Sequence, residues 1–177
     1  MPLYAALLRG VNVGGRKLPM ADLRETLVSL GFDDVVTYVQ SGNAVFSTRR
    51  KASRIGPEIE ERLAADFSMD VPVIVRTHTE LIGTLKANPF LGHADPARLH
   101  VTFLADSPPA ERLSGIESDR YAPDEWRAGN RAIYLHCPES YGETKLNNGF
   151  WERRLQTVAT TRNWKTVGKL AELTDPV

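Results

Sequence analysis

The first 76 residues alternate between two kinds of hydrophobic pattern, and this alternation limits the fold more than any other feature. Apolar or β-branched runs of strand length occur at residues 3–8, 35–39, 44–46 and 71–75. At 20–30 and 55–67, apolar residues instead recur every three or four positions, as they do on one face of a helix. The resulting order β-α-β-β-α-β is that of a ferredoxin-like split βαβ unit, whose antiparallel sheet is covered by helices on one face.

Glycine and proline positions support these boundaries. Pro19 suits the first turn of the first helix, and Gly31 followed by Phe32 suits its end. Residues 41–43, Ser-Gly-Asn, predict a hairpin turn between the second and third strands. We also expect Pro57 in the first turn of the second helix.

The second half predicts another α+β subdomain. Thr77 and Glu80 have the spacing of a helix capping box, and the alternating run at 99–105 predicts a strand. Gly129-Asn130 predicts a two-residue hairpin turn. We therefore expect an α+β protein with two subdomains, residues 1–76 and 77–177. No sequence repeat relates them, but the second is a candidate degenerate copy of the first.

The end of the chain predicts two helices. A short one is expected at residues 150–155. Thr161 is expected to cap a last helix, which carries Trp164 and Val167 on its apolar side.

Composition limits the classes of function. The 177 residues carry a formal net charge of +0, whereas a generic nucleic-acid coat protein is normally basic. The single cysteine, Cys137, excludes an internal disulfide and suits a reducing compartment. We see neither a signal peptide nor an apolar run of about 18 residues, and therefore expect a cytoplasmic protein with no membrane partner.

The connection between the first strand and the first helix is the strongest candidate for a binding site. It reads Arg-Gly-Val-Asn-Val-Gly-Gly-Arg-Lys over residues 9–17. Glycines free the backbone, and backbone N–H groups ahead of a helix, together with cationic side chains, are typical of anion sites. The alternative is a tight structural connection. The candidate ligand-binding residues are Arg9, Asn12, Gly14, Gly15, Arg16 and Lys17.

A second group of candidates lies near the start of the last helix. Arg162, Asn163 and Lys165 could close an anion site between the two subdomains. We do not expect the Gln40–Asn43 turn to belong to this site. We expect it at the opposite end of the sheet from the glycine-rich connection, which counts against one site built from both.

Catalytic and nucleic-acid signals are weak. His93, Asp95, His136 and Glu143 are candidates for proton transfer, but we find no nucleophile elbow or carboxylate dyad. The histidines lack paired ligand spacing, so we expect no metal site and no cofactor. A basic run suggests at most weak, salt-sensitive nucleic-acid binding because it lacks interleaved aromatic residues; its members are Arg49, Arg50, Lys51 and Arg54.

Three stretches in this order resemble one protein family. They are residues 7–15, 38–43 and 159–164 with 169–171, and residues 88–90, Asn-Pro-Phe, fit the same pattern. The chain resembles the bacterial domain-of-unknown-function family 1697 over nearly its full length. Lys165 stands where the family would carry an uncharged polar residue, often asparagine. The resemblance implies a two-part α+β protein without an assigned activity.

The sequence therefore leaves three hypotheses for function. The first is binding of a phosphate-bearing or other anionic small molecule in the cleft between the subdomains. The second is an enzyme that acts on such a ligand. The third is a weak nucleic-acid-binding protein. The sequence does not indicate whether the protein is a monomer or an oligomer.

Overall fold

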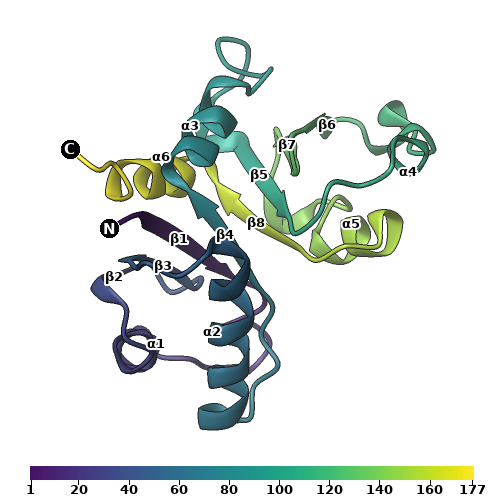
Figure 1. Ribbon diagram of the computed structural model, residues 1–177. Helices are drawn as coiled ribbons and strands as arrows, with labels where there is room; N and C mark the ends of the chain where they lie inside the picture. Colours follow the sequence, from purple (N-terminus) through teal and green to yellow (C-terminus); the bar gives the residue numbers. More distant parts are fainter. The chain divides into compact units, whose positions relative to one another are not determined.

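Two four-stranded antiparallel sheets form the framework of the chain, whose 177 residues are all described in a computed structural model (Figure 1). The strand order is β2-β3-β1-β4 in the first sheet and β6-β7-β5-β8 in the second. The two orders are the same when each strand is counted from the start of its own half. The α+β class and the antiparallel sheets predicted from the sequence are confirmed.

The first sheet belongs to a unit made of residues 1–81 and 170–177, which we call unit 1. The ferredoxin-like order predicted for this half is confirmed. Its elements are β1 (Leu3–Leu8), α1 (Met20–Ser29), β2 (Asp33–Tyr38), β3 (Asn43–Ser47), α2 (Ala52–Phe67) and β4 (Val73–Thr77), followed by α3 (His78–Lys86).

The second sheet belongs to residues 82–169, which we call unit 2. Three single-turn helices, η1 (Pro96–Arg98), η2 (Ser118–Tyr121) and η3 (Tyr141–Glu143), lie between its main elements. Those elements repeat the order of the first half, so the second half is a copy of the first in topology. They are β5 (Leu99–Leu104), α4 (Ala110–Ser114), β6 (Glu125–Gly129), β7 (Ala132–His136), α5 (Asn148–Leu155) and β8 (Ala159–Asn163), followed by α6 (Trp164–Leu173).

The units recognised in the structure differ from the predicted subdomains at both ends of unit 2. Helix α3 begins in unit 1 and continues in unit 2, while α6 begins in unit 2 and ends in unit 1. Within unit 1, Nδ1 of His78 lies 3.0 Å from the carbonyl oxygen of Ala171, so the end of α6 contacts the start of α3. None of the helices combines the length and the apolar character needed to cross a bilayer.

The core of unit 1 lies between its sheet and helices α1 and α2, which cover one face of that sheet (Figure 1). Alternate residues of β1, namely Tyr4, Ala6 and Leu8, face this core. Leu23 and Leu27 come from α1, and Ile55, Ile59 and Leu63 come from α2. Burying a large apolar side chain contributes about 1.5–3 kcal/mol, so this layer fixes the positions of both helices.

The core of unit 2 is built the same way and is richer in aromatic residues. Trp151 of α5 is fully buried, and its ring centroid lies 5.3 Å from that of Trp126 in β6. The indole N–H of Trp151 donates to the Leu146 carbonyl over 3.0 Å, which satisfies the one polar group this side chain carries into the core.

Two predicted helix signals are confirmed. Gly31 has φ +83°, and the N–H of Phe32 donates back to the Leu27 carbonyl over 3.3 Å, as in a glycine-terminated helix. The capping box before α3 is also present. The N–H of Thr77 donates to Glu80 over 2.8 Å, and the N–H of Glu80 donates to the Thr77 hydroxyl over 3.2 Å.

Several predicted boundaries are wrong by a few residues. Helix α2 begins at Ala52, so Pro57 lies inside the helix and not in its first turn. Strands β2 and β4 begin and end up to two residues from the predicted limits. The hairpin loop in unit 2 is Asn130-Arg131, because Gly129 pairs with Ala132. Helix α5 begins at Asn148, since the Asn147 side chain accepts a hydrogen bond from the Phe150 N–H over 3.0 Å.

The largest error concerns residues 159–163. Thr161 does not cap the last helix; it lies in strand β8, where β-branched residues are favoured. Its hydroxyl lies 2.7 Å from the Thr102 hydroxyl on the neighbouring strand. The cap of α6 is Asn163, whose side-chain oxygen accepts from the Thr166 N–H over 2.8 Å. Trp164 is half-buried rather than fully in the core.

Candidate functional site

Three connections meet at one end of the unit 1 sheet. They are residues 9–19 between β1 and α1, 39–42 between β2 and β3, and 68–72 between α2 and β4. Strands β1 and β2 both pair antiparallel with β3, so they run parallel to each other and finish at the same end. The prediction that the glycine-rich connection and the Gln40–Asn43 turn lie at opposite ends is therefore wrong. We call this region the loop end of unit 1.

Asn12 ties the first two of these connections together. Its side-chain amide donates to the Leu18 carbonyl over 3.0 Å and to the Gln40 carbonyl over 2.6 Å. Its side-chain oxygen accepts from the Leu18 N–H over 2.9 Å. Both amide hydrogens are used within the chain, so Asn12 fixes the shape of the loop end.

Gly42 lets the β2–β3 turn lie close against the glycine-rich connection. A Cβ atom at this position would lie 2.4 Å from a methyl carbon of Val11 and 3.0 Å from Cβ of Leu8. Gly42 also has φ +86°, and its carbonyl accepts from the Leu8 N–H over 2.8 Å. Close approach and a left-handed backbone together require glycine here.

The turn that precedes Gly42 carries an unusual backbone conformation. Val39 has φ +51° and remains 47% exposed. This left-handed region is sterically unfavourable for a β-branched residue. Gln40 follows directly, and its carbonyl is the one that accepts from Asn12.

Residues 13–16 of the glycine-rich connection form a miniature hairpin. The Arg16 N–H donates to the Val13 carbonyl over 3.1 Å, and the Asn12 N–H donates to the Arg16 carbonyl over 2.6 Å. Gly14 and Gly15, at its tip, have φ +57° and +84°, as a two-residue turn with both central φ positive requires. A Cβ atom on either glycine would meet nothing within 4 Å, so the tip is open to solvent.

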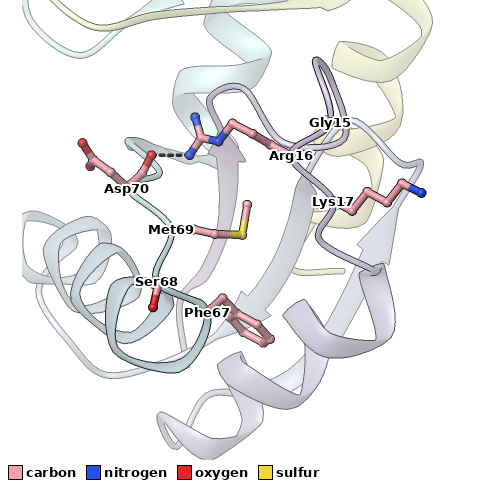
Figure 2. Close-up of a pocket in the computed structure, with 7 residues that line it drawn as sticks. All are labelled: Gly15, Arg16, Lys17, Phe67, Ser68, Met69 and Asp70. Carbon is pink, nitrogen blue, oxygen red and sulfur yellow. Dashed lines mark hydrogen bonds between the residues drawn. The ribbon is translucent and has the colours of Figure 1, made fainter.

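A cavity of about 690 Å³ opens beneath this hairpin (Figure 2). Its lining comes from the β1–α1 connection and from the segment that ends α2. The lining residues are Gly15, Arg16, Lys17, Phe67, Ser68, Met69 and Asp70. A nitrogen of the Arg16 guanidinium donates to the backbone carbonyl of Asp70, which joins the two walls. Figure 2 shows the Met69 side chain between the walls and the Lys17 side chain pointing away from it.

The charged and polar side chains of this cavity have few partners within the chain. Arg16 and Lys17 are exposed, and neither forms an ion pair. The Asp70 carboxylate and the Ser68 hydroxyl also have no hydrogen-bond partner, because Asp70 uses only its backbone carbonyl to hold Arg16. These four side chains are available to a bound molecule.

Sequence reasoning did not find the second wall of the cavity. The stretch Phe67-Ser68-Met69-Asp70 carries no motif, and only the fold brings the end of α2 to the β1–α1 connection. Arg9, a predicted site residue, is half-buried and does not line the cavity. Its N–H donates to the Pro72 carbonyl over 2.9 Å, which holds the first and third connections together.

The other predicted cationic group, Arg162 with Asn163 and Lys165, lies in unit 2. We expected Arg162 at the exposed start of a helix, and this is wrong. Arg162 lies in β8 and is only 6% exposed. One guanidinium nitrogen donates to the Thr160 hydroxyl over 2.7 Å and to the Thr161 carbonyl over 2.9 Å. Lys165 is exposed, and a ligand role for these residues stays a prediction.

The four catalytic candidates do not pair with one another. The Asp95 carboxylate accepts from the Ala97 N–H over 3.0 Å and makes no hydrogen bond with His93. His136 lies 3.1 Å from the Glu125 carboxylate at the edge of the unit 2 sheet. Glu143 lines a separate cavity of about 170 Å³ in unit 2.

Burial perturbs three titratable groups, all of them in unit 2. It lowers the pKa of His100 and raises that of Tyr134. It also raises the pKa of the Cys137 thiol to about 11, with a further contribution from the Asp124 carboxylate. Cys137 is therefore an inert buried thiol rather than a nucleophile.

The basic run after β3 is partly neutralised within the chain. The Glu58 carboxylate lies 2.8 Å from the Arg50 guanidinium and 3.9 Å from that of Arg54. Arg50 also lies over the Phe32 ring, 5.0 Å from its centroid. Two of the four charges thus share an acidic partner, in contrast to Arg16 and Lys17.

Comparison with known proteins places this geometry in a family. A conserved bacterial protein from Streptococcus pneumoniae, of known structure, superimposes with a TM-score of 0.75 over 98% of both chains at 24% sequence identity, which shows a shared fold. No curated protein matches the sequence. The family model described as "Protein of unknown function (DUF1697)" matches residues 1–134, which include the loop end of unit 1. The chain therefore belongs to the DUF1697 family, as its motifs indicated.

Proposed function

We propose that the loop end of unit 1 binds a small anionic ligand that carries a phosphate group. The observation that supports this most is the pair Arg16 and Lys17, which line one cavity and have no acidic partner in the chain. A cation without an acidic partner in the chain remains available to pair with a bound anion. Guanidinium and ammonium groups are also the side chains that bind phosphate best.

The hairpin tip supplies further donors. The N–H groups of Gly14 and Gly15 make no hydrogen bond within the chain, and the absence of side chains lets a ligand approach the backbone. Helix α1 begins at Met20, five residues after Gly15, so the positive end of its dipole lies near this loop. Asp22 in the first turn of α1 offsets part of that dipole.

Binding fits the lining of this cavity better than catalysis does. A nucleophile needs a base within hydrogen-bond reach, and the one hydroxyl in the lining, that of Ser68, has no hydrogen-bond partner. The lining contains no histidine or cysteine. Nucleic-acid binding is also less well supported, because Glu58 neutralises part of the basic run.

Isothermal titration with inorganic phosphate tests the proposal directly. Lys17→Ala should raise Kd about tenfold, since a charge-assisted hydrogen bond contributes roughly that factor. The Lys17 side chain makes no hydrogen bond or ion pair within the chain, so this change should leave the melting temperature unchanged. The matched control is Arg24→Ala, which removes another exposed cation of unit 1 outside the cavity. Equal loss of affinity in both variants, or no phosphate binding by the wild type, would contradict the proposal.

A further inference from the structure

The cavity of about 170 Å³ in unit 2 carries unpaired charges of both signs. Its lining comes from two long connections, residues 115–124 and 137–147, which unit 1 makes with only three and four residues. The lining residues are Arg120, Tyr121, Ala122, Pro123, Asp124, Glu139, Ser140, Glu143 and Lys145. Neither cation forms an ion pair, although three carboxylates line the same space. The two kinds of charge are therefore both available to a bound molecule.

Asp124 is positioned by a hydrogen bond that ties the two connections together. The Thr144 hydroxyl donates to one oxygen of the Asp124 carboxylate over 2.6 Å and accepts from the Leu146 N–H over 3.1 Å. Thr144 is buried and Asp124 is half-buried, yet the second carboxylate oxygen accepts no hydrogen bond within the chain. A carboxylate oxygen forms its strongest hydrogen bonds with a charged donor, so this position suits a ligand ammonium group.

Arg120 and Lys145 supply the opposite charge. Both side chains are exposed and make no hydrogen bond within the chain, so they can pair with an anionic group of a ligand. With three carboxylates and two cations, the lining has a net charge of −1, which disfavours a ligand that is anionic overall. The volume of the cavity is about the share that six water molecules have in the liquid, so the ligand is small.

From these features we infer that the unit 2 cavity binds a free amino acid. Asp124 accepts a hydrogen bond from the ligand ammonium group, and Arg120 and Lys145 pair with the ligand carboxylate. A small zwitterion meets charges of both signs at once, whereas a simple amine or a simple anion leaves one set unpaired. An amino acid is also neutral overall, as the net charge of the lining requires more than a phosphate compound would allow. This site is independent of the phosphate site proposed for unit 1.

Three compounds with one carbon skeleton test the inference, with amide NMR shifts of residues 139–145 as the readout. L-Alanine carries both charged groups, ethylamine lacks the carboxylate, and propionate lacks the ammonium group. L-Alanine should bind at least tenfold more tightly than either, because a hydrogen bond to a charged group contributes about that factor. Ethylamine binding as tightly as L-alanine would indicate a plain cation site, and equal binding of propionate an anion site. Either result, or no binding of any of the three, would overturn the inference.

The variant Asp124→Asn tests the ammonium end of the site. The asparagine side chain keeps an oxygen that accepts from the Thr144 hydroxyl, but it lacks the negative charge. L-Alanine binding should therefore weaken about tenfold. Asp119→Asn is the matched control, because Asp119 is an exposed carboxylate of the same connection that does not line the cavity. This control should leave the affinity unchanged.

A double variant, Arg120→Gln with Lys145→Gln, tests the carboxylate end without removing a hydrogen bond or an ion pair of the folded chain. It should reduce the affinity for L-alanine to that for ethylamine, and leave ethylamine binding unchanged or tighter. Lys86→Gln, which removes an exposed cation of unit 2 outside the cavity, is the control. Unchanged L-alanine binding by the double variant would overturn the inference, and so would unchanged binding by Asp124→Asn. If Asp124→Asn lowers the melting temperature, the double variant decides.

Discussion

Units 1 and 2 share one topology, but their long connections lie at opposite ends of the sheet. The connection between the first strand and the first helix has eleven residues in unit 1, at 9–19, and five in unit 2, at 105–109. The other two connections at that end are also longer in unit 1. At the other end the relation reverses. Residues 115–124 and 137–147 of unit 2 replace segments of three and four residues in unit 1, at 30–32 and 48–51.

Each cavity described above lies at the extended end of its own unit. The larger one lies under the 9–19 connection, and the smaller is lined by residues of 115–124 and 137–147. Unit 2 shows that five residues are enough to join the first strand to the first helix of this fold. The additional residues of unit 1 are therefore not required by the topology, which supports a role in binding.

The largest effect is expected where the connections of unit 1 pack most closely. Gly42→Ala should destabilise the protein by about 2–4 kcal/mol, because the new methyl group meets Val11 and the backbone is left-handed. Gly83→Ala, in helix α3 with open space around it, should instead stabilise by about 0.5–1 kcal/mol. Denaturant unfolding measures both. A neutral Gly42→Ala would show that the turn does not pack on the glycine-rich connection as described.

Removal of the Asn12 side chain, which links two connections of unit 1, should cause a smaller loss of stability. Asn12→Ala deletes three hydrogen bonds and should cost about 2 kcal/mol. In unit 2 the Asp106 N–H donates to the Thr157 hydroxyl over 3.1 Å, which joins the first and third connections, and this hydroxyl lies 3.4 Å from the Asp106 carboxylate. Thr157→Val should therefore cost about 1 kcal/mol. If chemical denaturation gives the larger loss for Thr157→Val, the loop end of unit 1 is not the more tightly organised one.

A substitution at Val39 should raise the stability of the protein rather than lower it. Val39→Asn should stabilise by about 0.5–1 kcal/mol, because asparagine tolerates the left-handed region better than a β-branched residue does. Val36 is 46% exposed in strand β2, where it pairs with Val45, and there the same replacement should destabilise by a similar amount. Thermal unfolding of the two variants checks the pair. A loss of stability in both would remove the case for strain in this turn.

The smallest effect is expected in unit 2 and depends on pH. Burial lowers the pKa of His100 in the folded state, so the unfolded chain takes up a proton first as the pH falls below 6.5. Stability should therefore decrease as the pH drops from 6.5 towards the folded-state pKa. His100→Gln should flatten this part of the stability curve, measured by melting temperature against pH. An unchanged slope in the variant would exclude His100 as its origin.

The sequence predicted elements well and contacts between loops poorly. Strand β1, helix α1 and the capping box at Thr77 follow from local patterns, and the structure has all three. The error at Thr161 arose because one threonine suits both a cap and a strand, and pairing with Thr102 decides between them.

The candidate site shows the same limit. Residues 14–17 carry a local signal that sequence analysis detected. Phe67 and Asp70 carry none, since their place beside Arg16 depends on the antiparallel pairing of β1 with β4, strands that are distant in sequence. The wrong prediction that the glycine-rich connection and the Gln40–Asn43 turn lie at opposite ends of the sheet has the same cause. The relative direction of β1 and β2 depends on their shared pairing with β3, which no local pattern reveals.

The central claim is that the loop end of unit 1, and not its counterpart in unit 2, binds phosphate. Titration of isotope-labelled protein with inorganic phosphate, followed by amide NMR shifts, tests this residue by residue. We predict saturable shifts at Gly14, Gly15, Arg16 and Lys17, and none at residues 105–107. Saturable shifts at 105–107 with unchanged glycine signals, or shifts at neither loop, would contradict it.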